Sequence, residues 1–333
     1  MNALKSIYML AGVTAVMLIG MAAFNYAVDP QCFYHCDTLD TTRQTVNVYY
    51  QVAQKIAAHP DAEQIILGSS RGETTSPLWL EKETGLKTLN LSVGGAEMKA
   101  KLAFLNIAQE RLKLKRVIWL ADYFELITEH ADAKIKNSPY LRRYIPESLR
   151  DQQSVAAIKD LLKLIDHNTL EASIYSISHR DQINLNQGAS SDADFELCAS
   201  DKYKGKETPA SLKKEVDSIY QSYVNQIFPV AQNPAAWAAF EQKVTELTSK
   251  GVAVVIVIAP YNPTFIENLK KEYPDIYQRH LEWIDKLRAL KSSSVSVVNF
   301  FEGIPSDDRS PAFWHDGVHF SCKGAQLLLQ KSN

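Results

Sequence analysis

The sequence predicts an α/β protein built on a doubly wound, flavodoxin-like parallel sheet, and three observations support this fold class. Short apolar runs alternate with helical patterns five times along the chain, which is typical of parallel strands joined by crossover helices. Residues 252–258 form an unbroken apolar run, as expected for a central strand covered on both faces. Ser70, Gly95 and Asp122 each follow a predicted strand. Ligand sites of such sheets lie beyond the carboxyl ends of the strands, so these residues are expected to share one edge.

Length and composition fit this fold and exclude one class of partner. The chain has 333 residues, of which 46% are hydrophobic, enough for one large or two modest cores. Lys and Arg number 36 against 38 Asp and Glu, which leaves a formal net charge of -2. Because there is no global basic field, a nucleic-acid partner is not expected.

The N-terminal segment predicts a membrane-spanning helix. Residues 7–28 are almost wholly apolar and uncharged, about the length that crosses a bilayer. A cleaved signal peptide is the alternative, but the run is longer than the usual signal-peptide core and no clean Ala-x-Ala site follows. We expect residues 1–29 to be an uncleaved anchor and residues 30–333 to be exported. Lys5 precedes the span and acidic residues follow it, which places the N-terminus in the cytoplasm.

The first half of the chain predicts three strands, each ending in small or polar residues. After a connector, a helix is expected over 45–58 and a strand over 65–67, and the strand runs into Gly-Ser-Ser-Arg-Gly. A helix over 78–84 should end at Gly85 in the left-handed conformation. A second strand, a long helix and a third strand are expected over the ranges 87–91, 98–112 and 116–120.

Residues 125–232 interrupt the alternation and predict a mainly helical insertion or cap. The pattern resumes at Asn233-Pro234, where asparagine caps a helix and proline occupies its first turn. That helix should end at Gly251, before the strand over 252–258. One long helix, a last strand and a closing helix complete the expected fold, over 263–290, over 295–300 and after residue 319.

Four cysteines are too few for a disulfide scaffold at this length. Cys32 and Cys36 flank a histidine, an arrangement open to a metal site, a disulfide or free thiols, but a fourth ligand at suitable spacing is missing. Pairing between Cys198 and Cys322 is also open, and export would favour a disulfide.

Two motifs indicate nucleophilic chemistry. Ser70 lies at the centre of Gly68-Ser69-Ser70-Arg71-Gly72, where the flanking glycines allow a sharp turn, so it is a better candidate nucleophile than Ser69. An activated serine needs a base, and the base needs a partner that holds its tautomer. His319 and Asp316 are three residues apart, so one loop can supply both. The alternatives are a structural or phosphate-binding turn for the first motif, and a solvated loop or helix cap for the second.

These motifs resemble the SGNH (GDSL-like) hydrolase superfamily. Gly-Ser-Ser of 68–70 resembles its first block, with Ser70 as nucleophile and Ser69 where the family often has aspartate. Asn-Leu-Ser-Val-Gly-Gly of 90–95 resembles the second, with Gly95 at the oxyanion position, and Asp-Gly-Val-His of 316–319 resembles the last. The third block departs from the family: Leu-Ala-Asp-Tyr stands at 120–123, so Asp122 occupies the place of an asparagine donor. A carboxylate there would repel an oxyanion unless it were protonated.

The N-terminal anchor and the Gly-Ser-Ser-Arg sequence also resemble exported SGNH proteins that modify cell-envelope polymers. The resemblance implies a bacterial inner-membrane protein with a single span and a periplasmic or extracellular catalytic domain. It implies a serine esterase or acyltransferase acting on O-acyl groups of a cell-surface glycan, with O-acetyl as the expected group. Ser70, His319 and Asp316 would be catalytic, the Ser70 and Gly95 N–H groups would bind the oxyanion, and no metal or other cofactor is needed.

Two alternatives remain open at this point. An α/β-hydrolase would also use Ser70, but that fold places several strands before the serine and separates its acid from its histidine. A non-catalytic glycan-binding or assembly subunit of a polysaccharide export complex, working with other assembly proteins, would explain the altered third block.

Overall fold

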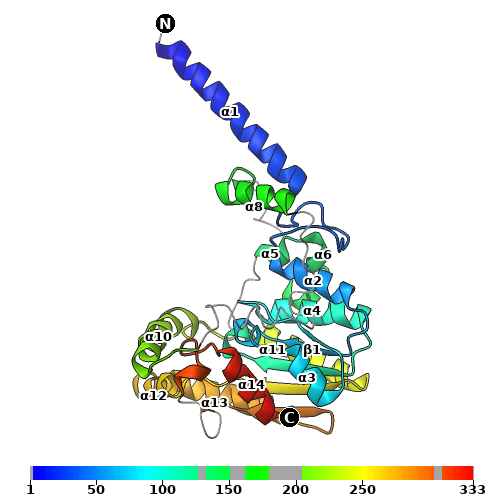
Figure 1. The fold of residues 1–333 in the computed structure, drawn as a ribbon, viewed down its shortest axis with the longest axis vertical. Coiled ribbons are helices and arrows are strands. Elements are labelled where there is room, and N and C mark those ends of the chain that lie inside the picture. The colour runs from blue at the N-terminus through cyan, green and yellow to red at the C-terminus, as the bar shows by residue number, and fades with distance from the viewer. Residues whose placement is uncertain (1–2, 127–132, 151–161, 180–204, 304–309, 333) are drawn as a thin grey trace. The chain divides into compact units, whose positions relative to one another are not determined.

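The computed structural model describes residues 3–126, 133–150, 162–179, 205–303 and 310–332 (Figure 1). The chain divides into two compact units. Unit 1 comprises residues 1–54, 132–143 and 150–185, and unit 2 comprises residues 55–131, 144–149 and 186–333.

Unit 2 contains a five-stranded sheet in which every pairing is parallel and the strand order is β2-β1-β3-β4-β5. The parallel α/β sheet predicted from the sequence is therefore confirmed. Each strand begins and ends within one residue of its expected bounds: β1 Gln64–Leu67, β2 Thr88–Asn90, β3 Arg116–Ala121, β4 Ala253–Ile258 and β5 Val295–Asn299.

The central strands of this sheet are covered on both faces. All four residues of β1 are buried, as are the last five residues of β3 and of β4. Because successive side chains of a strand point to opposite faces, an unbroken buried run requires cover on each side. Strand β5 lies at an edge of the sheet, and most of its residues are half-exposed.

Local sequence signals correctly predict the end of one helix of unit 2 and the start of another. Helix α3 ends at Gly85, which has a φ of 71° and so adopts the left-handed conformation that glycine tolerates. Helix α11 begins after Asn233, whose side chain accepts a hydrogen bond from the N–H of Ala235. The helices of unit 2, apart from single turns, are α3 Pro77–Thr84, α4 Met98–Arg111, α10 Pro209–Ser222, α11 Pro234–Ser249, α12 Pro263–Glu272, α13 Pro274–Ala289 and α14 Cys322–Ser332.

The prediction of a single long helix over 263–290 is wrong. The structure has two helices there, α12 and α13, separated at Tyr273. Pro274 is the physical reason, because proline lacks the N–H of the helical ladder and its ring clashes with the preceding turn. It fits instead as the first residue of the second helix.

Residues 125–232 contribute helices to both units. Helices α5 Ala133–Lys136, α6 Pro139–Arg142 and α8 His167–Ser178 belong to unit 1, and α10 belongs to unit 2. Residues 127–132, 151–161 and 180–204 of this stretch lie outside the described residues.

Unit 1 begins with α1 Ala3–Val28, the candidate membrane span. Lys5–Val28 spans 24 residues, its most apolar 18-residue window has a mean hydropathy of 2.1, and the helix is long and apolar enough to cross a bilayer. A signal sequence would meet the same criterion. Helix α2 Val48–Ala58 begins three residues later than expected because Asn47 accepts hydrogen bonds from the N–H groups of Tyr49 and Tyr50 and so caps it.

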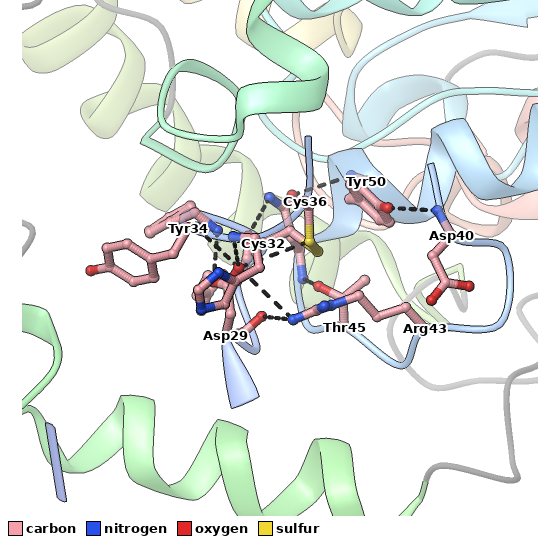
Figure 2. Close-up of a disulfide and its surroundings, with 12 residues drawn as sticks. Asp29, Cys32, Tyr34, Cys36, Asp40, Arg43, Thr45 and Tyr50 are labelled. Atoms are coloured by element: carbon pink, nitrogen blue, oxygen red, sulfur yellow. Dashed lines mark hydrogen bonds and ion pairs between the residues drawn. A yellow bond between two sulfur atoms is a disulfide. The ribbon is translucent and has the colours of Figure 1, made fainter. Parts of the chain in front are cut away.

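A tightly bonded loop follows α1 (Figure 2). Cys32 and Cys36 form a disulfide, which rules out metal ligation by this pair. Buried Asp29 accepts hydrogen bonds from the N–H groups of Phe33, Tyr34 and His35 at 2.7 to 3.0 Å. The loop is therefore held by a covalent bond and by a carboxylate that satisfies three backbone donors.

Candidate active site

The turn after β1 sends two neighbouring serines in different directions. Residues Ser70–Gly72 form a single 3-10 turn, η1, for which Ser69 is the cap. The Ser69 side chain is buried, donates to Asp122 Oδ2 at 2.6 Å and accepts from the N–H of Arg71. Ser70 is only half-buried, so its hydroxyl is the one that a substrate can reach.

Close packing explains why the last residue of this turn is glycine. A Cβ atom at Gly72 would approach Leu120 Cδ1 to 2.8 Å and collide with the Ser92 hydroxyl. Only a residue without a side chain lets the turn pack against the neighbouring strand ends.

The loop before α14 carries the acid and the histidine. Asp316 Oδ1 accepts hydrogen bonds from the N–H groups of Val318 and His319, both at 2.8 Å. The Gly317 carbonyl accepts from the Asn262 N–H at 2.9 Å, which ties this loop to the segment after β4. A Cβ at Gly317 would come within 2.9 Å of Ile219 and 3.1 Å of Phe265, so this glycine permits close packing against α10 and α12.

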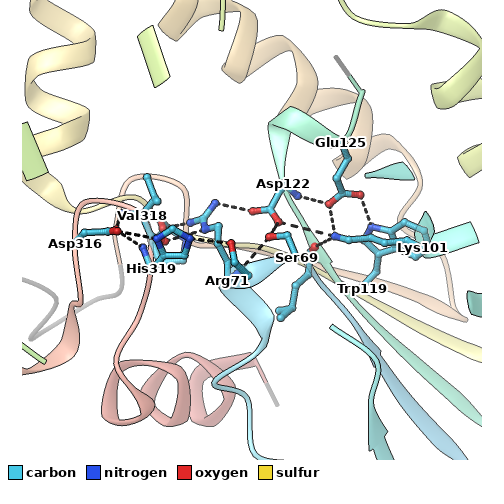
Figure 3. A network of polar contacts seen from close by, with 12 residues as sticks. Ser69, Arg71, Lys101, Trp119, Asp122, Glu125, Asp316, Val318 and His319 are labelled. Atoms are coloured by element: carbon cyan, nitrogen blue, oxygen red, sulfur yellow. Dashed lines mark hydrogen bonds and ion pairs between the residues drawn. The ribbon is translucent and has the colours of Figure 1, made fainter. Parts of the chain in front are cut away.

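Ser70, His319 and Asp316 form one continuous hydrogen-bond chain. The Ser70 hydroxyl lies 2.8 Å from His319 Nε2. His319 Nδ1 lies 2.8 Å from Asp316 Oδ2 (Figure 3). An ionised carboxylate only accepts hydrogen bonds, so the proton belongs on Nδ1 and Nε2 is left to accept from the serine. The structure thus brings together three residues that are separated by as many as 249 positions in the sequence.

The environment of Asp316 keeps its carboxylate ionised. Burial by itself would raise the pKa of Asp316, but the hydrogen bond and charge of His319 and two backbone N–H donors lower it below the usual value. Side-chain exposures of 21% for His319 and 12% for Asp316 leave the chain open at its histidine end and sheltered at its acid end.

Two backbone N–H groups beside Ser70 are free to receive an anion. Among the described residues, neither the Ser70 nor the Gly95 N–H has an acceptor, whereas the Gly94 N–H donates to Glu73 Oε1 at 2.6 Å. Gly95 is exposed and has a φ of 73°, a conformation that glycine tolerates. A Cβ at Gly94 would lie 3.8 Å from the Ser70 Cβ, so this loop is adjacent to the serine.

Asp122 lies in a buried ion pair, away from solvent. Its Oδ1 atom accepts from Arg71 Nη1 at 2.8 Å, and its Oδ2 atom accepts from Ser69. Both Arg71 and Asp122 are 2% exposed. Because the arginine compensates the carboxylate and the protein encloses both, Asp122 does not present its charge to a bound substrate.

Arg71 also joins the serine turn to the histidine loop. Its Nε atom donates to the Val318 carbonyl at 3.0 Å, its Nη2 atom donates to the Pro260 carbonyl, and its guanidinium stacks 4.6 Å from the Tyr261 ring centroid. From the segment after β1, this one side chain contacts the segments that follow β3 and β4 and the loop of His319. The arginine of the Gly-Ser-Ser-Arg-Gly motif is thus paired with a buried carboxylate.

Sequence reasoning missed the second half of this network, Lys101 and Glu125. Lys101 Nζ donates to Glu125 Oε1 at 2.5 Å and lies 3.9 Å from Asp122 Oδ2, while the Trp119 indole donates to Glu125 Oε2 (Figure 3). Burial raises the pKa of Glu125 to about 7, with Lys101 opposing this and the charge of Asp122 adding to it. A usable signal was present: Lys101 lies three residues after Met98 and four before Leu105, on the apolar stripe of its helix.

No group of three or more His, Cys, Asp or Glu side chains in the described ranges is arranged to hold a metal ion. Cys322 is disulfide-bonded, and Cys198 lies outside the described residues.

Comparison with known proteins finds remote similarity to solved structures. No protein-family model matches the chain, and no curated protein matches it. Two solved structures resemble the fold distantly, each with a TM-score of 0.37. One, from Streptococcus pneumonia, is provisionally named a platelet activating factor; it shares 14% identity, with 86% of this chain and 91% of that chain covered. The other, from Bacteroides fragilis, is provisionally named an acylhydrolase; it shares 11% identity, with 84% and 92% covered.

Proposed function

We propose that this protein is a serine esterase or O-acyltransferase that works through an acyl-enzyme on Ser70. The observation that carries the proposal is the hydrogen-bond chain Ser70–His319–Asp316, with both links at 2.8 Å. A nucleophile bonded to a base, and a base held by an ionised carboxylate, is the arrangement that acyl transfer requires.

In the proposed mechanism, Ser70 Oγ attacks the acyl carbonyl while His319 Nε2 takes the hydroxyl proton. Asp316 stabilises the imidazolium that forms, and the Ser70 and Gly95 N–H groups bind the developing oxyanion. His319 then gives the proton to the leaving alkoxide, which departs and leaves the acyl group on Ser70. Water or a sugar hydroxyl attacks this ester, His319 takes its proton, and the same steps in reverse release Ser70.

The strand order and the placement of the three residues support an SGNH-type fold. The order β2-β1-β3-β4-β5 is that of flavodoxin-like doubly wound sheets. Among the described strands, β1 alone precedes Ser70, and the acid and the histidine share one loop. An α/β-hydrolase places several strands before its serine and separates these two residues, so it is the weaker alternative.

We further propose that α1 anchors the protein in the bacterial inner membrane, with the catalytic residues on the periplasmic or outer side. Two features support export: α1 has the length and hydropathy of a span, and Cys32 and Cys36 form a disulfide directly after it. Disulfides persist in oxidising compartments and are rare in the cytosol. A cell-surface glycan carrying O-acyl groups is the substrate class we propose for such a location, with O-acetyl as the proposed acyl group.

One observation favours a second candidate, a non-catalytic glycan-binding or assembly subunit. Asp122 stands where the resembled family has an asparagine donor, and the structure buries it in an ion pair. The proposed oxyanion site then has two backbone donors and lacks the side-chain donor. Loss of one such donor costs about 10²- to 10³-fold in rate, which leaves a slow enzyme rather than none.

Serine labelling of the purified full-length protein tests the proposal. We expect a fluorophosphonate probe to label the wild type and not Ser70→Ala or His319→Ala, with aryl-acetate hydrolysis lost in parallel. Ser92→Ala is the matched control, because Ser92 lies at the same edge of the sheet with a buried hydroxyl that has no hydrogen-bond partner among the described residues. A folded wild type that is neither labelled nor active would favour the non-catalytic candidate.

A further inference from the structure

Helix α8 and the turn before it have an inverted distribution of polar and apolar side chains. Ser173 and Ser176 are buried, whereas Ile174 is 54% exposed and Ile177 is 53% exposed. Leu162 and Ile165, just before the helix, are also exposed. A helix on the surface of a water-soluble domain buries its apolar residues and exposes its polar ones, so this pattern indicates a different surrounding medium.

The buried side of α8 packs on the last turns of α1. Asn25 of α1 donates to the Leu164 carbonyl at 2.7 Å and accepts from the Ser173 hydroxyl at 2.8 Å, and all three residues are buried. A small-residue helix surface that hydrogen-bonds to a neighbouring helix is typical of packing in membranes, where apolar contact alone gives no preference for protein over lipid. Figure 1 shows α8 beside the C-terminal end of α1.

The position of this contact along α1 sets the depth at which α8 would lie relative to the membrane surface. The apolar stretch of α1 ends at Asp29, four residues after Asn25, which is about 6 Å along a helix. Helices that lie in a membrane interface insert their apolar face about 5–10 Å. Tyr26 lies at this level, with ring centroids 5.2 Å from Tyr34 and 4.5 Å from His35. Aromatic residues of this kind are enriched where a span meets water.

The size and charge of α8 favour the membrane surface over its interior. The helix has 12 residues, too few to cross a bilayer, for which about 20 are needed. His167 and Glu171 are exposed beside the apolar residues, with His167 Nδ1 3.6 Å from Glu171 Oε1. A helix with both kinds of exposed side chain belongs at the boundary between headgroups and acyl chains.

From these observations we infer that α8, with Leu162 and Ile165, binds the phospholipid surface beside the end of α1. The exposed isoleucines enter the boundary between headgroups and acyl chains, and Asn25 clamps the helix to the span. The inference rests on the proposed membrane insertion of α1. It adds a second membrane contact. This contact fixes the orientation on the bilayer of the disulfide-bonded loop that follows α1.

Site-directed fluorescence of the full-length protein in phospholipid vesicles tests this contact. The described cysteines are all disulfide-bonded, so a single introduced cysteine can be labelled with an environment-sensitive dye. Ile177→Cys reports on α8, Ile19→Cys reports on the middle of α1, and Lys213→Cys reports on an exposed position of unit 2. All three residues are exposed, so the substitutions leave the core intact.

We expect the label at position 177 to shift to shorter emission wavelength, to resist iodide and to be quenched by nitroxide-bearing lipids, unlike the label at 213. If position 177 behaves like 213 while position 19 is quenched by the lipids, the inference fails and the anchor stands. If position 19 is not quenched either, the proposed anchor itself fails. Self-quenching at 177 that depends on protein concentration and not on nitroxide lipids would overturn the inference in favour of a second copy of the chain.

Discussion

Two polar groups meet at the carboxyl edge of the sheet, and they differ in their access to water. Ser70, His319 and Asp316 form an open hydrogen-bond chain, with half-buried Ser70, the candidate nucleophile, at one end. The neighbouring network of Arg71, Lys101, Asp122 and Glu125 is wholly buried, with two cations and two carboxyl groups facing one another. Ser70 and Arg71 are consecutive residues, yet the turn sends one to solvent and the other to the interior.

This difference separates two uses of the same chemistry. A reacting group must be reachable, so its hydrogen bonds end at the surface. A group that holds segments together gains from burial, because ion pairs and hydrogen bonds are stronger where water does not compete. Removing one partner of a buried pair is strongly destabilising, because an unpaired charge costs far more free energy when it is buried than when it is exposed.

The largest expected effect is a loss of activity, with little change in stability, when Asp316 of the Ser70–His319–Asp316 chain is replaced. Asp316→Asn should lower kcat for an aryl acetate on the order of 10⁴-fold, because an amide in place of the carboxylate favours the wrong tautomer of His319. The asparagine oxygen can still accept from the Val318 and His319 N–H groups, so the urea midpoint should change little. The exposed Asp285→Asn serves as control. A loss of activity below tenfold would show that Asp316 does not orient the base.

The next effect probes the buried network. Asp122→Ala should lower the free energy of unfolding by about 3–5 kcal/mol, because it leaves Arg71 buried without its counter-charge. Asp217→Ala is the matched control, since Asp217 forms an exposed pair with Lys213 and should cost no more than about 1 kcal/mol.

Urea unfolding of both variants makes this measurement. Equal costs for the buried and the exposed aspartate would erase the proposed distinction between the two groups. The double variant Arg71→Met with Asp122→Leu should recover part of the loss, because it removes both charges together.

The smallest expected effect concerns the pH dependence of stability that His280 contributes. His319 is partly exposed, whereas His280 is fully buried, and burial lowers the pKa of His280 to about 4. With a pKa of about 6.5 in the unfolded chain, the stability that His280 contributes is complete above about pH 6.5 and is lost as pH falls through 4. Between pH 7 and pH 4, the wild type should lose about 3 kcal/mol more than His280→Phe, measured by urea unfolding.

Glu125 works in the opposite sense, so the comparison must be a difference between proteins. Its pKa is raised to about 7, and protonation therefore favours the folded state as pH falls from 7 toward 4.5. This contribution is common to the wild type and His280→Phe and cancels between them. An identical pH dependence of the two proteins would show that His280 does not remain neutral in the folded state.

Much of the architecture follows from local signals in the chain. The apolar runs located the five strands, Asn233 and Pro234 marked the start of α11, and Gly85 marked the end of α3. Those signals act over a few residues, so they are legible without a structure. Pro274 was a local signal too, but the prediction of one long helix over 263–290 did not take it into account.

The candidate site divides in the same way. Glycines around Ser70 and the spacing of Asp316 and His319 are local features, so the sequence alone singled out all three residues. It could not show that Ser69 turns inward, that Asp122 pairs with Arg71, or that Lys101 reaches Glu125 across 24 positions. Those outcomes depend on which strand ends become neighbours and on how much water reaches each side chain in the folded protein.

By itself, then, the sequence determined the parallel α/β class, the apolar span and the identity of the candidate nucleophile, base and acid. Only the tertiary structure decided which polar residues are exposed and which are buried, and which helix lies against the end of α1. The physical reason is that strands and turns are specified by side chains near one another in the chain. Burial, charge pairing and helix docking are specified by segments that meet only after folding.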